Sequence, residues 1–425
     1  MSLRCEILST GDEVLTGQIT DTNAAFLADR MGSLGFEVVR HTTVGDDRAM
    51  LAAAFRQLGA SADVVLCTGG LGPTVDDLTT EVAAEVLGAE LKLDEPALAY
   101  MEGLWRSRGR TMPENNRKQA LLPEPAEVLP NPVGTAPGFA ARIDRAWFFF
   151  MPGVPHEMKQ MFAEQVVPRL ERLRDEPTVF DVRVLRSFGL TESATDQALA
   201  GLEALFPGVK LGFRAHFPEI QIKLTVKGSD VDAARIRLDA ADAEVRRRLG
   251  AHVFSDGAPL ESVVGEGLRR EGATLATAES CTGGLVAEML TAIAGSSEYF
   301  DRGFVTYSNQ AKMDLLGVSA EILREHGAVS EACARAMAEG ARLRSGATYA
   351  VAVTGIAGPG GGTPDKPVGL VFVALATPGG TAVRKLLWPG RRRDQIRSIS
   401  AMVALDLVRR ALSALPLDPE SARAQ

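Results

Sequence analysis

The chain has 425 residues, of which 46% are hydrophobic and 24% charged, so it is an ordinary folded chain long enough for two to four domains. Its 46 basic and 54 acidic side chains give a net charge of −8, the opposite sign from proteins that coat nucleic acid, so we expect no nucleic-acid partner. Four scattered cysteines without a Cys-x-x-Cys pair exclude a disulfide framework and a structural zinc site. No apolar run approaches about 18 residues and no export signal is visible, which predicts a cytoplasmic protein without a membrane partner.

The first part of the chain, residues 1–174, alternates between strand and helix patterns. We expect strands at 5–9, 37–44, 63–68 and 146–151, and helices at 23–34, 51–58, 78–87 and 156–173. This order predicts a doubly wound α/β domain, in which helices cover both faces of a parallel sheet. Ligands of such sheets bind beyond the carboxyl ends of the strands.

The pattern changes near Pro177. Residues 175–255 predict a small α+β domain, with strands at 179–187 and 219–226 and helices at 193–205 and 230–249. A turn-rich stretch at 255–259 leads into the third domain, 256–425. There we expect a second α/β arrangement, with helices at 260–271, 284–293 and 393–415, strands at 274–278, 303–307 and 349–354, and a hairpin at 369–376 and 382–387.

A glycine-rich loop follows the strand at 63–68. Residues 68–74 (TGGLGPT) allow backbone N–H groups to approach an anion, and the next helix adds its positive end. Asp76 and Asp77 come next, and carboxylates repel a phosphate unless a cation lies between them, so the pattern suggests a metal-bridged phosphate. Asp12 and Glu13, at the neighbouring strand end, could complete the metal site. The alternative is that Asp76 and Asp77 only favour the start of a helix electrostatically.

These stretches resemble the molybdopterin-binding-like domain of the CinA (competence/damage-inducible) family. The resemblance rests on residues 11–17 (GDEVLTG), 21–23, 69–77 (GGLGPTVDD), 131–138 and 151–155. In that family the domain is associated with metal-dependent cleavage of ADP-ribose to AMP and ribose 5-phosphate, which implies a divalent ion such as magnesium, manganese or cobalt. The resemblance implies a metal or pyrophosphate role for Asp76 and Asp77. It implies substrate contacts at Gly69, Gly70, Gly72, Thr74, Asn115 and Lys118, although Asn115, Arg117 and Lys118 also fit an ordinary solvated helix start.

A serine in residues 278–284 (AESCTGG) lies at a turn between a strand and a helix. Such a turn exposes Ser280 and places helix N–H groups where they can bind an oxyanion. A serine needs a base to act as a nucleophile. Lys312, the single lysine between Lys227 and Lys366, is the natural base if burial lowers its pKa. The alternatives are a helix N-cap for Ser280 and a surface charge for Lys312.

The third domain resembles the CinA C-terminal domain, the PncC-type amidase, which hydrolyses nicotinamide mononucleotide (NMN) to nicotinate mononucleotide and ammonia. The resemblance covers residues 278–284, 303–312, 326–330, 355–359 and 366–369. It implies that Ser280 is the nucleophile and Lys312 the base, with Tyr307 at a substrate or oxyanion position and no cofactor. It also implies substrate contacts at Thr282, Gly283, Thr354, Gly355, Arg393 and Arg397. Residues 390–393 (GRRR) depart from the family's usual Gly-Asp-Arg, so the arginine that contacts phosphate stays open.

The middle domain falls where this family carries a KH-like module, but residues 178–254 contain no clear Gly-x-x-Gly clamp. A spacer or dimerisation role is therefore expected rather than RNA binding, and family analogy suggests a homodimer. The whole sequence predicts a two-site nucleotide hydrolase of pyridine nucleotide salvage, with NMN and ADP-ribose as its small-molecule partners. The alternative is a non-catalytic regulatory protein that binds a nucleotide or pterin and is linked to competence or DNA damage.

Overall fold

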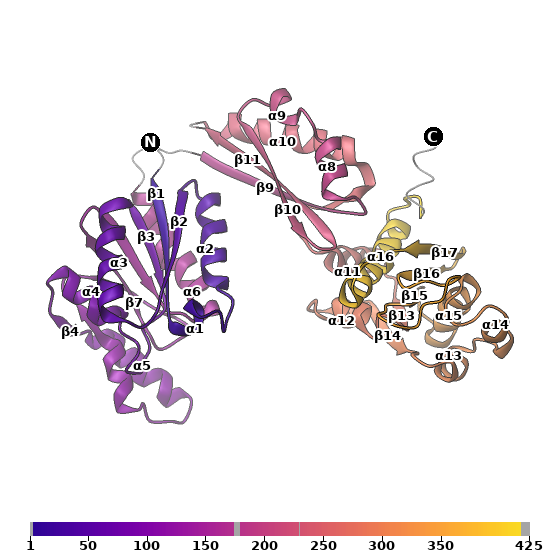
Figure 1. Ribbon diagram of the computed structural model, residues 1–425, viewed down its shortest axis with the longest axis horizontal. Coiled ribbons are helices and arrows are strands. Elements are labelled where there is room, and N and C mark those ends of the chain that lie inside the picture. The colour runs from indigo at the N-terminus through magenta and orange to yellow at the C-terminus, as the bar shows by residue number, and fades with distance from the viewer. Residues whose placement is uncertain (1–2, 174–178, 229, 418–425) are drawn as a thin grey trace. The chain divides into compact units, whose positions relative to one another are not determined.

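The computed structural model describes residues 3–173, 179–228 and 230–417. The chain divides into two compact units, one of Met1–Asp181 with Val226–Arg235, and one of Val182–Thr225 with Ile236–Gln425. Both units mix helices and strands, as the sequence predicts (Figure 1). No helix in the described part of the chain combines the length and the apolar character needed to cross a membrane.

The N-terminal module contains a six-stranded sheet in the order β2-β1-β3-β8-β7-β6. Four strands are parallel, which confirms the predicted doubly wound core: β1 (Arg4–Thr10), β2 (Glu37–Val44), β3 (Val64–Thr68) and β8 (Ala146–Met151). Two further strands, β7 (Gly138–Ile143) and β6 (Glu127–Leu129), extend the sheet in antiparallel fashion. These two strands are not predicted from the sequence. The β7–β8 turn contains Asp144 with a φ of 51°, which is uncommon for a residue with a side chain.

Helices cover both faces of this sheet (Figure 1). On one face, α3 (Arg48–Ser61) and α4 (Thr79–Leu87) pack on Val65 and Phe148. On the opposite face, α2 (Thr22–Ser33) and α6 (Pro155–Met161) pack near Leu66 and Phe149. Successive strand residues point to opposite faces, so a strand buried on both sides reads as a continuous apolar run. This explains why β3 and β8 are apolar throughout.

The helix predicted at 156–173 is divided in the structure. After α6 the chain forms one π-helical stretch, Phe162–Val166, and then α7 (Val167–Arg172). Pro168 lacks a backbone N–H and its ring clashes with the carbonyl of the preceding turn, so a wider turn before it relieves the clash.

A small excursion lies between α4 and the second half of the sheet. It consists of the antiparallel pair β4 (Leu91–Leu93) and β5 (Leu121–Pro123), the helix α5 (Glu95–Ser107) and the 3-10 helix η1 (Glu114–Ala120). Asp94 caps α5 by accepting the N–H of Ala97 at 2.8 Å. None of these elements is predicted from the sequence, and they contribute to the surroundings of the first site.

The middle segment is α+β, as predicted, with a four-stranded sheet in the order β10-β11-β9-β12. The strands are β9 (Val179–Phe188), β10 (Val209–His216), β11 (Glu219–Gly228) and β12 (Val253–Ser255), and the helices are α8 (Glu192–Ala198), α9 (Leu202–Leu205), α10 (Val231–Leu249) and the 3-10 helix η3 (Gly250–His252). Alternate residues of β11 are buried, from Ile220 to Val226, which is the pattern of a sheet with one covered face. Strand β10 was missed because its sequence alternates too weakly.

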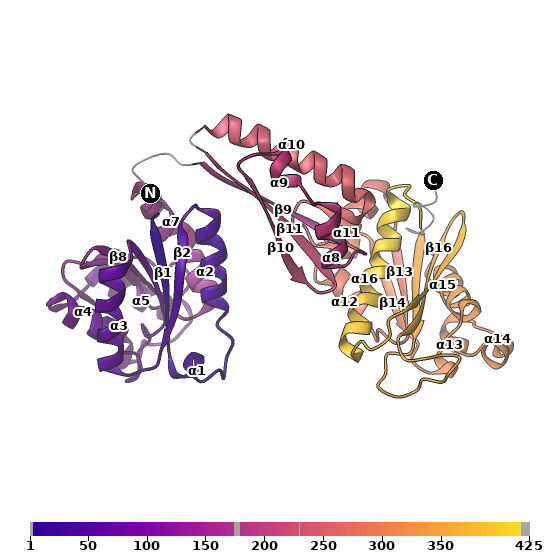
Figure 2. The same cartoon turned by 45° about the horizontal axis from the view of Figure 1, so that its top comes forward.

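The C-terminal module has a five-stranded sheet in the order β14-β13-β15-β16-β17. Parallel strands β14 (Phe300–Val305), β13 (Leu275–Glu279) and β15 (Tyr349–Gly355) continue into the predicted hairpin of β16 (Leu370–Thr377) and β17 (Gly380–Leu387). One face packs on α11 (Leu260–Glu271), α12 (Leu285–Thr291) and α16 (Arg393–Leu412), and the other on α13 (Asn309–Leu316), α14 (Ala320–Glu325) and α15 (Glu331–Ser345) (Figure 2). A 3-10 turn, η4 (Ser296–Glu298), precedes β14.

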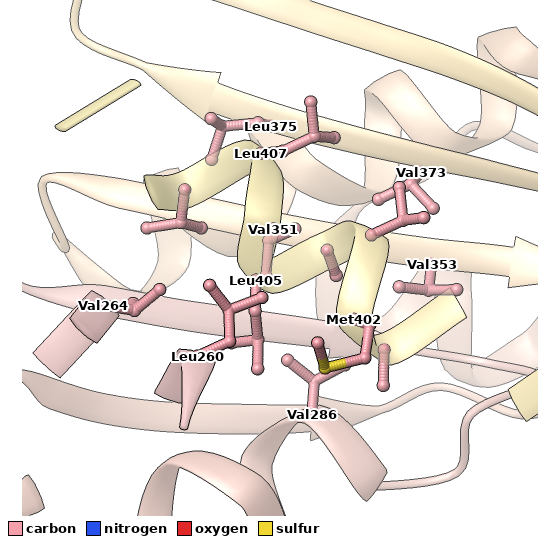
Figure 3. Close-up of a cluster of buried hydrophobic side chains, with 14 of the residues drawn as sticks. Leu260, Val264, Val286, Val351, Val353, Val373, Leu375, Met402, Leu405 and Leu407 are labelled. Carbon is pink, nitrogen blue, oxygen red and sulfur yellow. The ribbon is translucent and has the colours of Figure 1, made fainter. Parts of the chain in front are cut away.

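Helix α16 is buried on most of its sides. Its apolar residues meet β15 and β16 in one continuous core (Figure 3). The same helix buries the carboxylate of Asp406 between two guanidinium groups, since Arg409 and Arg410 donate to its two oxygens at 2.6 Å each. Arg409 also donates to the carbonyl of Ala251 at 2.8 Å. These charges are paired inside the core, where an unpaired charge would be strongly destabilising.

Candidate functional site

The first site is a cavity of about 480 Å³ at the carboxyl ends of β1, β3 and β8. Residues that follow each of these strands line it, including Gly11, the loop 69–73 and Pro152. This is the edge at which doubly wound sheets bind ligands. The structure therefore brings together the two loops that the sequence singled out.

The glycines of this loop allow it to pack against the end of β1. Gly69 and Gly70 have φ values of 103° and 66°, which disfavour any other residue. A Cβ atom on Gly69 would lie 2.5 Å from the carbonyl oxygen of Thr10, and one on Gly70 would overlap the hydroxyl of Thr79. The loop therefore exposes its backbone to the cavity while its other side touches neighbouring backbone and side-chain oxygens.

Two of the predicted residues hold the loop in shape. The carboxylate of Asp77 accepts the N–H of Thr74 at 2.9 Å and its hydroxyl at 2.6 Å. Lys118 donates to the carbonyl oxygens of Thr74 and Asp77 at 3.1 and 2.8 Å. Asp76, by contrast, is exposed at the cavity. Asp76 is thus the member of the pair with its carboxylate available to a ligand.

The polar residues of η1 that face the cavity are not the ones that the sequence predicted. Asn115 is exposed and does not line the cavity, whereas its neighbour Asn116 is buried and donates to Gln119 at 2.9 Å. Gln119 lines the cavity and donates to the carbonyl oxygen of Leu71 at 3.3 Å. Because η1 is a 3-10 helix with three residues per turn, Gln119 shares the inward face of Asn116 and Asn115 points outward. An α-helical phase would place residues 115 and 119 on the same face, so no signal in the sequence indicated this.

Sequence reasoning also missed Asp46, which lies just after β2 at the same sheet edge. Asp46 lines the cavity together with Glu13 and Asp76. The N–H of Asp12 donates to Asp46, and the N–H of Asp46 donates to Asp12, both at 3.1 Å. Burial, with the neighbouring carboxylates Asp12, Glu13 and Asp76, raises the pKa of Asp46. Among the described residues, however, no three His, Cys, Asp or Glu side chains converge as a metal site would require.

The second site begins at the end of β13. The N–H of Ser280 donates to the carbonyl of Val353 at 2.9 Å, so the serine continues the sheet before the chain turns. Gly283 and Gly284 make the turn with φ values of 60° and 98°. Helix α12 begins at Leu285, so Ser280 is not its N-cap.

Glu279, which precedes the serine, was not singled out from the sequence. It is 1% exposed, and its carboxylate accepts the N–H groups of Gly284, Val286 and Ala287 at 3.0, 3.1 and 2.9 Å. These are the helix N–H groups predicted to bind an oxyanion, and that prediction is wrong because a buried carboxylate already occupies them. The N–H groups of Cys281 and Thr282 donate to no backbone carbonyl within the described residues.

Lys312 lies beneath this turn, on the first turns of α13. It is 1% exposed rather than a surface charge, and its Nζ atom lies 3.1 Å from Ser280 Oγ. The same nitrogen donates to the carbonyl of Thr306 at 2.8 Å and reaches that of Tyr307 at 3.5 Å. Burial lowers the pKa of Lys312 and so favours the neutral amine. A neutral amine has two N–H groups and one lone pair, which matches two carbonyl acceptors and one serine hydroxyl.

The other predicted residues surround this pair and mostly contact the backbone. Arg397 donates to the carbonyl of Thr282 at 2.7 Å, and Thr354 donates to that of Ala328 at 2.8 Å. Arg393 donates to the carbonyl of Gly358 at 2.8 Å and to the hydroxyl of Tyr307, which is 60% exposed, at 3.0 Å. Arg393 is therefore the arginine whose polar partner is exposed to solvent.

Thr282 and Gly355 are two more of the residues that the sequence predicted for this site. The hydroxyl of Thr282 is buried and has no hydrogen-bond partner among the described residues. Gly355 ends β15, where a Cβ atom would lie 2.6 Å from a methyl group of Val371. Glycine is thus required there for the strand to pass its neighbour, whatever the ligand.

Three family models match consecutive parts of the chain: a probable molybdopterin binding domain at residues 6–172, a damage-inducible protein CinA KH domain at 182–255 and a CinA C-terminal domain at 257–412. A CinA-like protein from an Anaeromyxobacter species is 49% identical over 97% of this chain and 100% of its own length. Those from Desulfosudis oleivorans and Shewanella loihica are each 46% identical, over 96% and 98% of this chain and 99% and 97% of their own. Since these similarities extend over almost the whole length of each protein, the chain belongs to the CinA family.

Proposed function

We propose that the C-terminal site is an amidase that hydrolyses nicotinamide mononucleotide to nicotinate mononucleotide and ammonia. The observation that supports this most directly is the distance of 3.1 Å between Ser280 Oγ and the buried Nζ of Lys312. A serine hydroxyl next to a neutral amine is an activated nucleophile, and it needs no metal or organic cofactor.

The reaction follows from the contacts of these two residues. Lys312 takes the proton of Ser280 while Oγ attacks the carboxamide carbon, and the resulting ammonium group stays solvated by the carbonyl of Thr306. When the carbon–nitrogen bond breaks, this proton leaves with the amine as ammonia. Water then cleaves the ester on Ser280. Lys312 takes a proton from the water as its oxygen attacks the acyl carbon, and returns this proton to Oγ as the ester bond breaks, which releases nicotinate mononucleotide and restores both residues.

When Ser280 attacks, the oxygen of the substrate's carboxamide becomes negatively charged, and it must be stabilised by hydrogen-bond donors other than the N–H groups of α12. The N–H groups of Cys281 and Thr282 are next to the nucleophile, and donors placed in this way are worth roughly 100- to 1000-fold in rate each. Arg393, which donates to the exposed hydroxyl of Tyr307, is the proposed contact for the phosphate of the substrate, because a guanidinium group pairs well with phosphate oxygens. Arg397 is bound to the turn itself and is proposed to support it.

We propose that the N-terminal site hydrolyses the pyrophosphate of ADP-ribose with a divalent ion. Glu13, Asp46 and Asp76 crowd negative charge into one cavity but do not converge on one point. An ion there would therefore be held by one or two of these carboxylates, whose oxygens suit magnesium or manganese, with the phosphates of the substrate as further ligands. A bound divalent ion supplies charge neutralisation of the phosphates and a more acidic water. The protein's own part is to orient the phosphates on the backbone of the 69–72 loop and the adjoining N–H groups.

The two activities can be assigned independently in the full chain. Ser280→Ala should abolish ammonia release from NMN and leave ADP-ribose cleavage unchanged, while Asp76→Ala should do the reverse. Because each activity reports only on its own unit of the chain, thermal unfolding of each variant is the folding control. Ammonia release by Ser280→Ala at the wild-type rate would refute the amidase assignment, and ADP-ribose cleavage that survives both EDTA and Asp76→Ala would refute the metal site.

A second possibility for the N-terminal site is binding without turnover. The observation that favours it is that no three of the described carboxylate, imidazole or thiol groups converge on one point. In that case the protein would bind AMP or ADP-ribose, with or without divalent ions, and produce no ribose 5-phosphate from ADP-ribose.

A further inference from the structure

A cavity of about 570 Å³ lies where the middle segment meets the C-terminal module, and we call it the junction cavity. Residues from 190–198 and 247–252 line it, together with Arg410 near the end of α16 and Pro416 after it. These elements belong to one compact unit, in which Phe188 and Phe254 of the middle segment share a buried core with α11 and α16. The junction cavity has the volume of a small-molecule site, and no described residue lines both it and the cavity of the first site.

The charged side chains that line the junction cavity are all basic, namely those of Arg247, Arg248, Arg410 and His252. No Asp or Glu of the described chain lines it. The remaining walls are mostly apolar and include Leu190, Ala194, Leu249 and Pro416. Charge of one sign in a hollow with walls of low dielectric constant concentrates the electrostatic field. The lining therefore favours an anion that also carries an apolar part.

Two of these arginines share a single carboxylate at the end of α10. Arg247 and Arg248 both donate to Glu244 at 2.7 Å, and Arg248 also donates to the carbonyl of Ala200 at 2.8 Å. One carboxylate between two guanidinium groups leaves one positive charge unbalanced, which also offsets the partial negative charge at this helix end. Nη1 of Arg247 and Nη2 of Arg248 donate to no acceptor in the described part of the chain.

Arg410 is the buried basic group of the junction cavity. It is 2% exposed, and it donates to Asp406 at 2.6 Å through Nε and to the carbonyl of Pro416 at 3.0 Å through Nη1. Asp406 also accepts from Arg409, so a second carboxylate is divided between two guanidinium groups. Nη2 of Arg410 has no acceptor within residues 3–173, 179–228 and 230–417. A buried N–H without an acceptor is unfavourable, and an anionic oxygen in the cavity would remove this cost.

The junction cavity is distant from the amidase pair. Arg393 and Arg397 lie on the first turns of α16 and Arg410 on its last, so roughly 20–25 Å of helix separates them at 1.5 Å per residue. A phosphate bound by Arg410 is therefore not the phosphate of a substrate whose amide lies at Ser280. The described lining residues also offer no carboxylate, hydroxyl or thiol as a nucleophile, which indicates binding rather than a third reaction.

We propose that the junction cavity binds a phosphorylated small molecule, with its phosphate held by Arg248 and Arg410. Guanidinium groups suit this ligand because their N–H groups pair with several phosphate oxygens at once. The organic part of the ligand would lie against Leu190, Leu249 and Pro416. This site is additional to both proposed hydrolytic sites and depends on neither activity.

The test measures hydrogen–deuterium exchange of the full chain with inorganic phosphate as the probe, and with sodium chloride at the same ionic strength for comparison. Phosphate should slow exchange in residues 190–198 and 247–252 in a saturable manner, and chloride should not. Arg248→Gln keeps a polar side chain without the charge, and it should weaken this phosphate protection at least about tenfold. Arg235→Gln, at an exposed position of α10 outside the cavity, is the matched control and should bind phosphate as the wild type does.

The readout is local, so phosphate bound at the 69–72 loop is seen separately and should be the same in both variants. Equal protection by chloride, protection confined to the 69–72 loop, or unchanged phosphate affinity at the junction in Arg248→Gln would each overturn the proposal. If Arg248→Gln does not fold, Arg247→Gln decides, because that side chain is 70% exposed and its loss leaves the packing intact. Arg247→Gln should weaken the junction protection at least about threefold, and wild-type protection in that variant would then refute the site.

Discussion

Replacement of Lys312 by methionine is the sharpest test of the amidase site. The side chain keeps its length and apolar stem but loses the nitrogen that lies 3.1 Å from Ser280 Oγ. Removal of a general base typically lowers a rate by roughly 100- to 10,000-fold, and no other basic side chain in the described chain is hydrogen-bonded to this hydroxyl. We therefore expect a loss of ammonia release from NMN of at least about 100-fold.

The same change should leave the fold intact. Lys312→Met removes the hydrogen bonds to the carbonyls of Thr306 and Tyr307, worth about 1 kcal/mol each, and relieves the cost of burying an amine. The net effect on the free energy of unfolding should stay below about 2 kcal/mol, which is small against a typical total of about 5–15 kcal/mol. Lys385→Met, an exposed lysine of β17, is the matched control and should retain wild-type ammonia release.

The assay measures ammonia release and thermal unfolding for Lys312→Met, Ser280→Ala and the double variant. Because a nucleophile and its base act as one unit, the double variant should be no slower than the slower single variant. Two independent losses that multiply in the double variant would contradict the pairing. So would a Lys312→Met protein that unfolds normally and retains more than about a tenth of the wild-type rate.

The remaining predictions concern charge at four positions. Ammonia release should rise with pH through the lowered pKa of Lys312, because the base works only as the neutral amine, and a flat pH–rate profile would contradict this. Glu279→Gln replaces a carboxylate that only accepts hydrogen bonds with an amide whose N–H donors would face backbone N–H donors. It should lower kcat and reduce the free energy of unfolding, measured by chemical denaturation, by about 1–3 kcal/mol. The midpoint of the pH–rate profile should not change, because Lys312 sets it. Asp46→Asn should raise the melting temperature of the metal-free protein by relieving repulsion from Glu13 and Asp76, yet weaken any divalent-dependent cleavage of ADP-ribose. Asp406→Ala leaves two buried guanidinium groups without their partner and should cost about 3–5 kcal/mol in urea unfolding, with ammonia release per folded molecule unchanged.

The central pair of the second site could be predicted because its residues carry chemical signals in the sequence. Ser280 lies at a strand-to-helix turn, and Lys312 is conspicuous because lysine is scarce around it. Glu279 was harder to identify because a glutamate beside a serine gives no pattern by itself. Its role depends on a turn of two left-handed glycines that brings the start of α12 back over its carboxylate.

At the first site the sequence located the loops but not all of the side chains that face the cavity. The rule that parallel strand ends share one edge would have included Asp46, which follows β2, just as it included Asp12 after β1. A separate apolar cavity of the N-terminal module was beyond prediction, because it joins α5, which is not predicted from the sequence, to the loop at residues 130–137. Long-range packing of this kind leaves no periodic signal in a single sequence.

The electrostatics of the two sites explain how a chain with a net charge of −8 can be proposed to handle anionic nucleotides. In the second site the carboxylate of Glu279 is bound to three helix N–H groups, and burial lowers the pKa of Lys312, which favours its neutral form and so a reacting centre of low charge. Positive charge comes from two guanidinium groups: Arg397 is bound to the carbonyl of Thr282, and Arg393 meets the exposed hydroxyl of Tyr307. This arrangement favours a substrate with an uncharged reacting amide and a phosphate near Arg393. It follows that Arg393→Ala should raise KM for NMN more than it lowers kcat, whereas an equal loss of kcat would place that guanidinium at the reacting group instead.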